Sequence, residues 1–407
     1  MNTFDEVIEY LYVQLPMFQN KGEKALEYKL DNILTFCSHL KHPQNNYPII
    51  HIAGTNGKGS VAHILASILQ EAGLKVGLYT SPHLKSFTER IKVNGDEISE
   101  KAVISFVNKN ILETEKLKPS FFEWTVAMAF EEFSQQNVDI AVIEVGLGGR
   151  LDSTNIVQPI LSIITNISYD HTHILGDTLS KIAYEKAGII KNGVPIVIGE
   201  WNEETLTVFQ KKALKMNAPL ILSDAHSEVY ECELKGKYQQ KNIQTVLTAI
   251  NTLNEGMFEI SKEHIKNGLS NVIKNTQLKG RWQVLTEIPK MVCDTAHNEA
   301  GVSIVVEQLA TDNFTQLWII WGMVKDKDFE KILSLLPKEA NYYFCEPNIE
   351  RKLDASELVS VATKIGLKAK LEKNVNNAIS KVKSLASDDD LIYIGGSTFV
   401  VAEIDEL

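Results

Sequence analysis

One segment constrains the fold more than any other, because it joins an apolar run to a helix through a turn rich in glycine. Residues 48–53 form a short apolar run, the turn is Gly54-Thr55-Asn56-Gly57-Lys58-Gly59-Ser60, and residues 61–69 continue as an apolar helix. Glycines let backbone N–H groups wrap a polyphosphate, and Lys58 would then reach the β- and γ-phosphates. A glycine-rich turn also occurs without a ligand, but a lysine inside it adds little to folding. The segment therefore predicts the opening of an α/β nucleotide-binding domain, although Gly59 separates Lys58 from Ser60 and departs from the standard spacing.

Further apolar runs predict a mostly parallel sheet and a second domain. Buried strands are expected at residues 75–79, 140–145, 161–165 and 194–198. A polar stretch at residues 277–281 then separates a second series, with strands expected at residues 291–293, 317–322, 342–345 and 391–394. A chain of 407 residues exceeds one ordinary domain of roughly 150 residues. The predicted fold is α/β, with a P-loop domain at residues 1–278 and a smaller Rossmann-like domain at residues 279–407.

Composition excludes several classes of partner. The net charge of −11 argues against nucleic acid, whose phosphates need basic patches. The four cysteines have no paired CxxC spacing, so neither a disulfide framework nor a zinc site is expected. No apolar stretch approaches the roughly 18 residues of a membrane span. We therefore expect a cytoplasmic protein that binds no membrane.

A second cluster places Glu144 at the end of an apolar strand, before Gly146-Leu147-Gly148-Gly149. Dinucleotide binding is a weak interpretation, because Leu151 stands where a GxGxxG motif needs its third glycine. A carboxylate at a strand end beside a P-loop suits Mg²⁺, which keeps water and phosphate among its ligands. The alternative is a solvated strand end.

A third cluster combines Asp170-His171-Thr172 with Glu185-Lys186-Ala187-Gly188. His171 is a candidate ligand of a second cation, although a lone histidine is more often a hydrogen-bonded structural residue. Apolar neighbours of Lys186 would favour its neutral amine, which can take up CO₂ as a carbamate. The residues alone nevertheless favour a surface ion pair for Lys186.

These motifs, together with Thr80-Ser81-Pro82-His83-Leu84, occur in an order that resembles the folylpolyglutamate synthases, including bifunctional dihydrofolate synthases, of the Mur ligase superfamily. The resemblance extends from about Leu15 to the end of the chain. It implies a monomeric ligase that uses ATP and L-glutamate and acts on dihydropteroate or a reduced folate through an acyl phosphate.

The resemblance also implies roles for individual residues. Lys58, His171 and Lys186 would be catalytic, with Lys186 carbamylated. Ser81 and Glu144 would hold one Mg²⁺ and His171 a second, with K⁺ as a further candidate ion. The nucleotide would contact the turn residues Gly54, Thr55, Asn56, Gly57, Lys58, Gly59 and Ser60.

In the second domain, Asp294-Thr295-Ala296-His297-Asn298 resembles the family's Asp-Gly-Ala-His-Asn motif, with Thr295 in place of glycine. Asp294 would contact the ribose of ATP, and Arg281 its phosphates. Asn242 would contact adenine in a motif where Tyr238 replaces the usual histidine. The folate-type acceptor would lie near Asp152, Asn155 and residues 16–30, and His297 near glutamate. Asp294 and His297 can instead be read as caps of a strand-to-helix turn.

Three rival functions remain open. A peptidoglycan-precursor ligase would need an additional N-terminal domain, and only about 50 residues precede the glycine-rich turn. A P-loop kinase or switch would turn over ATP without glutamate. A nucleotide-binding structural module would have no turnover, which the metal-ligand candidates at strand ends disfavour.

Overall fold

The computed structural model describes residues 1–14, 29–223, 230–256, 258–325 and 327–407. Within them the chain separates into two units. The first comprises Met1–Glu233 and Gln239–Gln277, and the second comprises Leu234–Tyr238 and Leu278–Leu407. Most of the segment expected beside the acceptor, residues 16–30, lies outside the described residues.

The boundary after Gln277 lies one residue before the predicted boundary after residue 278, and the short segment Leu234–Tyr238 belongs to the second unit. The backbone N–H of Lys237 donates to Gln308 Oε1 at 2.8 Å, and Gln308 Nε2 donates to the carbonyl of Lys235 at 3.3 Å. These contacts join residues more than 70 positions apart, so no local sequence pattern indicates them.

The first unit is built on an eight-stranded sheet in the order β4-β3-β2-β5-β1-β6-β7-β8. The pairs from β2 through β8 are parallel, while β3 and β4 form an antiparallel edge. Its strands are β1 (Ile49–Ala53), β2 (Val76–Tyr79), β3 (Ile91–Val93), β4 (Asp96–Glu97), β5 (Ile140–Glu144), β6 (Leu161–Ile164), β7 (Ile196–Ile198) and β8 (Leu220–Leu222). The strand expected at residues 48–53 and the four further predicted strands of this domain are all present, whereas β3, β4 and β8 at the two edges of the sheet were not predicted.

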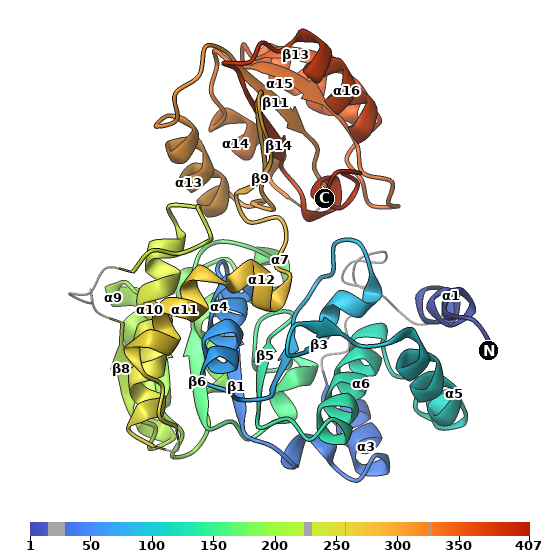
Figure 1. Cartoon of the computed structure of the whole chain (residues 1–407), viewed down its shortest axis with the longest axis vertical. Coiled ribbons are helices and arrows are strands. Elements are labelled where there is room, and N and C mark those ends of the chain that lie inside the picture. Colours follow the sequence, from blue (N-terminus) through green and yellow to red (C-terminus); the bar gives the residue numbers. More distant parts are fainter. Residues whose placement is uncertain (15–28, 224–229, 257, 326) are drawn as a thin grey trace. The chain divides into compact units, whose positions relative to one another are not determined.

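Helices cover both faces of this sheet because its central strands are buried throughout. The helices α4 (Lys58–Glu71), α10 (Gln239–Asn254), α11 (Lys262–Ser270) and α12 (Val272–Thr276) pack together on one face (Figure 1). Within the described residues of this unit, the other α-helices are α1 (Phe4–Gln14), α3 (Asp31–His39), α5 (Glu100–Leu117), α6 (Phe121–Gln135), α7 (Thr172–Leu175), α8 (Leu179–Lys186) and α9 (Glu203–Lys215).

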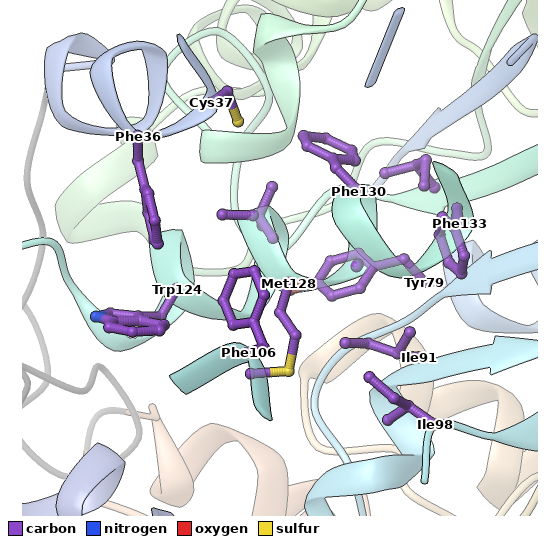
Figure 2. Packing of buried hydrophobic residues seen from close by; sticks show 14 of the residues in the cluster. Phe36, Cys37, Tyr79, Ile91, Ile98, Phe106, Trp124, Met128, Phe130 and Phe133 are labelled. Atoms are coloured by element: carbon purple, nitrogen blue, oxygen red, sulfur yellow. The ribbon is translucent and has the colours of Figure 1, made fainter. Parts of the chain in front are cut away.

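A large aromatic core supports the β2 and β5 side of the sheet. Figure 2 shows Phe36 of α3, Phe106 of α5 and Trp124 of α6 packed around one another. The Trp124 ring lies 5.2 Å from that of Phe36 and 5.6 Å from that of Phe106, both edge-on. Such pairs add roughly 0.5–1.5 kcal/mol beyond the burial of their area, so this core holds the first turn of α6 in a fixed place against the sheet.

The second unit contains a six-stranded sheet in the order β13-β12-β11-β14-β10-β9, parallel except for β9. Its strands are β9 (Gln283–Glu287), β10 (Lys290–Cys293), β11 (Leu317–Trp321), β12 (Asn341–Phe344), β13 (Lys368–Leu371) and β14 (Leu391–Gly395). Its helices are α13 (Glu299–Leu309), α14 (Phe329–Ser334), α15 (Ala355–Lys364), α16 (Val375–Leu385) and α17 (Thr398–Ala402). The α/β fold class with two parallel-sheet domains is confirmed.

None of the helices in the described ranges is long and apolar enough to cross a membrane.

Candidate active site

The glycine-rich turn links β1 to α4, and its backbone requires glycine at two places. Gly54 and Gly57 have φ angles of 150° and 83°. A Cβ on Gly54 would lie 1.9 Å from Thr165 Oγ1, and one on Gly57 would lie 2.4 Å from Asn242 Oδ1. Because α4 begins at Lys58, its first N–H groups lack helical partners and form an anion-binding end.

Neighbouring elements hold this turn in place. The N–H of Thr55 donates to the carbonyl of Asn166 at 2.9 Å, and that of Asn56 donates to Asn166 Oδ1 at 3.0 Å. Lys58 Nζ donates to the carbonyl of Thr55 at 3.2 Å. The lysine thus lies folded over the turn.

Helix α10 brings Asn242 to the same turn. Gln239 Nε2 donates to Ser60 Oγ at 3.2 Å, while Gln239 Oε1 accepts from Asn242 Nδ2 at 2.8 Å. The structure therefore brings together all the predicted nucleotide residues of the first unit.

The candidate metal ligands lie beside the turn because the parallel strands β2, β5, β1 and β6 end at one edge of the sheet. Ser81 follows β2, and Glu144 is the last residue of β5. The backbone N–H of Ser81 donates to Glu144 Oε2 at 3.2 Å. Glu144 is only 5% exposed, so the solvated strand end considered above is wrong. A buried carboxylate beside a phosphate-binding turn suits Mg²⁺.

His171 lies in the loop after β6, the strand next to β1, and occupies the N-cap position of α7 with a φ angle of 48°. Its backbone N–H donates to Asp170 Oδ1 at 2.8 Å, and its Nε2 lies 3.8 Å from the same oxygen. No group of three His, Cys, Asp or Glu side chains that could hold a metal occurs within the described residues. A cation near His171 would therefore need oxygen atoms from other sources.

Lys186 is not the surface ion pair that the residues alone favoured. Its side chain is 4% exposed, and Nζ donates to the carbonyl of Gly54 at 2.9 Å. Burial is the largest cause that lowers the pKa of Lys186 to about 7; the charge of Lys58 contributes in the same direction, while Asp170 opposes the shift. A large fraction of neutral amine is thus available near neutral pH, beside the glycine-rich turn.

Asp152 is held by a chain of hydrogen bonds that starts in the sheet. Thr154 Oγ1 donates to Asp152 Oδ1, and His51 Nε2 of β1 lies 2.8 Å from Thr154 Oγ1. Because the single threonine proton goes to the carboxylate, His51 carries its proton on Nε2 and donates. Burial lowers the pKa of His51 to about 3, so its ring is neutral. His51 and Thr154 thus fix the orientation of Asp152, and neither was singled out from the sequence.

Asn155 holds two loops together with its amide. Its Nδ2 donates to the carbonyls of Arg150 and Gly188, at 3.1 and 3.2 Å. Its Oδ1 is buried without a hydrogen-bond partner in the described structure. The donor side of Asn155 is therefore structural, and only its oxygen remains for a ligand.

Phe122 lies beside Asp152, although the sequence analysis gave it no role. A Cβ on Gly146 would lie 2.4 Å from Phe122 Cζ and 3.2 Å from Asp152 Oδ2. The aromatic ring and the carboxylate therefore approach the same face of this glycine. The signal that was missed is the aromatic pair directly after Ser120, which caps α6.

In the second unit, Asp294 is almost saturated with hydrogen bonds. It is 3% exposed, and it accepts from Tyr238 Oη at 2.6 Å, Trp282 N at 2.7 Å and Ala296 N at 2.8 Å. Tyr238, which replaces the expected histidine, therefore binds the carboxylate directly. One lone-pair position of Asp294 Oδ1 remains for a ribose hydroxyl.

Arg281 and His297 both contact Thr295. Arg281 Nη1 donates to Thr295 Oγ1, and His297 Nδ1 lies 3.0 Å from the carbonyl of Thr295. The φ angle of Thr295 is not positive, so the loop does not need the glycine expected there. Asn298 caps α13 by accepting from the N–H of Gly301 at 2.9 Å, so the capping role considered for Asp294 and His297 belongs to Asn298.

Family comparisons match both units. The Mur ligase middle domain matches residues 52–267, and the Mur ligase glutamate ligase domain matches residues 280–398. A dihydrofolate synthase/folylpolyglutamate synthase from Bacillus subtilis is 34% identical and covers 92% of this chain and 94% of its own.

Solved structures agree. Escherichia coli FolC in complex with DHPP and ADP superposes with a TM-score of 0.85 at 28% identity, covering 98% of this chain and 96% of its own. A bifunctional folylpolyglutamate synthase/dihydrofolate synthase with Mn, AMPPNP and L-glutamate bound gives a TM-score of 0.84 at 28% identity, covering 99% and 97%.

Proposed function

This chain belongs to the folylpolyglutamate synthase/dihydrofolate synthase family of Mur ligases, and we propose that it joins L-glutamate to the carboxylate of a folate-type acceptor with ATP. The acceptor is a reduced folate, dihydropteroate or both. One observation carries this proposal: the glycine-rich turn, Glu144 and His171 lie at the carboxyl ends of the neighbouring strands β1, β5 and β6. Lys186 reaches the same edge of the sheet, because its Nζ donates to the carbonyl of Gly54. That arrangement suits phosphoryl transfer to a carboxylate rather than hydride or acyl-enzyme chemistry.

The reaction begins when the acceptor carboxylate attacks the γ-phosphorus of ATP and ADP leaves. The acyl phosphate is then attacked by the amine of glutamate, phosphate departs, and an amide forms. Lys58 and the N–H groups of α4 orient the phosphates, and no protein nucleophile is required. Mg²⁺ held by Glu144 and Ser81 would neutralise phosphate charge.

Lys186 is proposed to carry a carbamate. Its neutral amine bonds to the carbon of CO₂ and releases one proton, which leaves an anionic oxygen group in place of the ammonium. Those oxygens would complete a second Mg²⁺ site with His171, where the described side chains alone supply too few ligands. The lowered pKa of Lys186 supports this step, because only the neutral amine reacts.

Lys186→Ala should therefore be nearly inactive, with partial rescue by a short added carboxylate such as acetate. Removing CO₂ from the wild-type enzyme should lower its rate, and bicarbonate should restore it. Bicarbonate-independent wild-type activity together with an active Lys186→Ala variant would rule out the carbamate. K⁺ rests on the resemblance alone, and exchanging it for Na⁺ at constant ionic strength tests it.

In the second unit, Arg281 is proposed to contact ATP phosphates, Asp294 the ribose, and His297 glutamate. The three hydrogen bonds that Asp294 already accepts leave room for one further donor, which suits a single ribose hydroxyl. In the first unit, Asn242 would contact adenine, and Asp152 with Asn155 the acceptor.

One assay decides between these functions. ADP release is measured without acceptor and L-glutamate, with each of them alone, and with both together. Dihydropteroate and tetrahydrofolate are used as separate acceptors. We expect turnover only with both, and a product that has gained one glutamyl residue. ATP turnover without glutamate would favour a kinase, and turnover with a different amino acid or acceptor would favour another Mur-type ligase. A monomeric state and a cytoplasmic location remain proposals, testable by light scattering and by cell fractionation.

A further inference from the structure

Three polar side chains outside the roles assigned above form a hydrogen-bonded series in the first unit. Tyr12 comes from α1, His83 from the loop after Ser81, and Arg90 from the end of the 3₁₀ helix η3 (Phe87–Arg90). Arg90 is 3% exposed, and its guanidinium lies 5.3 Å from the centre of the Phe121 ring. No ion pair joins Arg90 to a carboxylate in the described part of the chain. A buried charge with this environment is costly to fold, so its position needs an explanation.

The direction of each hydrogen bond follows from what an arginine can do. Arg90 Nε can only donate, so His83 Nδ1, 2.7 Å away, is the acceptor and carries no proton. With Nδ1 acting as the acceptor, the ring carries one proton and is neutral. Its single proton is therefore on Nε2, which lies 3.2 Å from Tyr12 Oη and donates to it.

With these hydrogen-bond directions, the hydroxyl proton of Tyr12 is not donated to His83. Tyr12 Oη accepts from His83, and in the described residues its proton has no acceptor. The tyrosine is half-buried, with its ring 5.5 Å from that of Phe121. A half-buried hydroxyl proton without a partner in the protein is expected to meet water or a ligand.

The surroundings of Tyr12 indicate which ligand this is. Phe121 begins α6, and the next residue, Phe122, lies beside Asp152. On the other side, His83 stands two residues after Ser81, whose N–H donates to Glu144. The series is therefore connected through neighbouring residues both to the proposed metal ligands and to the proposed acceptor residue Asp152, while the nucleotide residues Lys58 and Asn242 belong to other elements. The nearby charge of Arg90 favours an electronegative ligand atom.

We infer that Tyr12 donates a hydrogen bond to an oxygen or ring nitrogen of the folate-type acceptor, and that His83 and Arg90 act as positioning residues that hold it as a donor. This inference rests on the proposed function and deepens it by naming a residue that recognises the acceptor. Tyr12 contributes to acceptor affinity and takes no part in phosphoryl transfer.

The first experiment is Tyr12→Phe, which keeps the ring and removes the hydroxyl. We expect KM for the acceptor to rise about tenfold, the loss of about 1.4 kcal/mol, while kcat and the KM values for ATP and glutamate change less than twofold. Tyr10→Phe is the matched control, because Tyr10 lies on the same helix and forms no hydrogen bond with described residues. It should leave every parameter unchanged.

The second experiment tests the order of the series. His83→Gln keeps an acceptor for Arg90 and a donor for Tyr12, so acceptor KM should rise less than in His83→Leu. In the double variant, adding Tyr12→Phe should raise the acceptor KM by much less than tenfold over that of His83→Leu alone. The reason is that the Tyr12 hydroxyl is already misplaced when His83 is lost.

An acceptor KM within twofold of wild type in Tyr12→Phe overturns the inference, as does an equal rise in the KM for ATP. The proposed function is tested separately by the wild-type protein, whose failure to ligate glutamate would overturn that proposal and not this one alone.

Discussion

Lys58 and Lys186 lie close enough in the first unit for the charge of one to lower the pKa of the other. Their surroundings differ. Lys58 is partly exposed at the start of α4 and donates to its own turn, whereas Lys186 is enclosed and donates to Gly54. One lysine is therefore suited to hold phosphate as a cation, and the other to react as a neutral amine.

Lys58→Ala should reduce ligation at least 100-fold while the thermal midpoint stays within a few degrees, because it removes a phosphate contact and no core volume. Steady-state ligation and thermal unfolding are measured on the same preparation. Lys109→Ala, which removes a surface lysine paired with Glu131, is the control. Ligation near the wild-type rate would mean that this turn does not bind the ATP that reacts.

Glu144→Gln keeps the shape of the side chain and an oxygen for the N–H of Ser81, but loses the charge that stabilises a divalent cation. We expect the Mg²⁺ concentration for half-maximal rate to rise at least tenfold, with partial recovery of the rate at high Mg²⁺. The measurement is a Mg²⁺ titration of the rate at saturating substrates. An unchanged titration curve would contradict the ligand assignment.

At the scale of elements, α4 shows how one helix is bounded by two glycines with different tasks. Gly57 precedes its first residue and Gly73 follows its end, and both have a φ angle of 83°. A Cβ on Gly57 would collide with Asn242 of α10, whereas a Cβ on Gly73 would meet nothing within 4 Å. The same φ angle therefore occurs at a close approach to α10 at one end of the helix and at an open chain reversal at the other.

Gly57→Ala and Gly73→Ala separate these tasks. Each should cost roughly 1–2 kcal/mol of stability from the left-handed backbone. Gly57→Ala should in addition raise KM for ATP more than tenfold, because Asn242 must move, while Gly73→Ala should leave it unchanged. Calorimetry and ATP kinetics on both variants make the comparison. Equal ATP kinetics in the two variants would show that the contact between the turn and α10 does not matter for nucleotide binding.

For the whole molecule, an enclosed lysine makes the stability of the fold depend on pH. The unfolded chain protonates Lys186 with a pKa near 10.5, whereas in the folded chain burial lowers it to about 7. Between these values the unfolded state binds more protons, so this group makes the fold more stable as pH rises. Below pH 7 both states are protonated, and the full cost of burying the charge is present.

Lys186→Met removes this charge and fills a similar volume. In CO₂-free buffer the variant should be inactive yet more stable than the wild type at pH 7. The difference in free energy of unfolding between the variant and the wild type should shrink by about 1.4 kcal/mol per pH unit towards pH 10. Denaturant unfolding of both proteins at several pH values measures the difference. Parallel pH profiles would mean that Lys186 is already solvated in the folded protein.

Local sequence patterns were sufficient to predict the architecture. Apolar runs located the central strands of both sheets, and the glycines located the turn between β1 and α4, since each signal lies in residues adjacent along the chain. The strands β9 and β13 were missed because their side chains are largely polar or exposed. Once parallel strands are assigned, their carboxyl ends meet at one edge, which is why Glu144 and His171 were expected near the turn before the structure placed them there.

The sequence by itself therefore determined the two-domain α/β architecture, the family resemblance and the edge of the sheet that carries the candidate site. Only the tertiary structure decided that Lys186 is enclosed and that Tyr238 binds Asp294. It also decided that Arg90 donates to Nδ1 of His83, which leaves the ring proton on Nε2. The physical reason is distance along the chain. Lys186 and its partner Gly54 are 132 residues apart, and whether a side chain is buried, and which atom it bonds, depends on residues that only folding brings beside it.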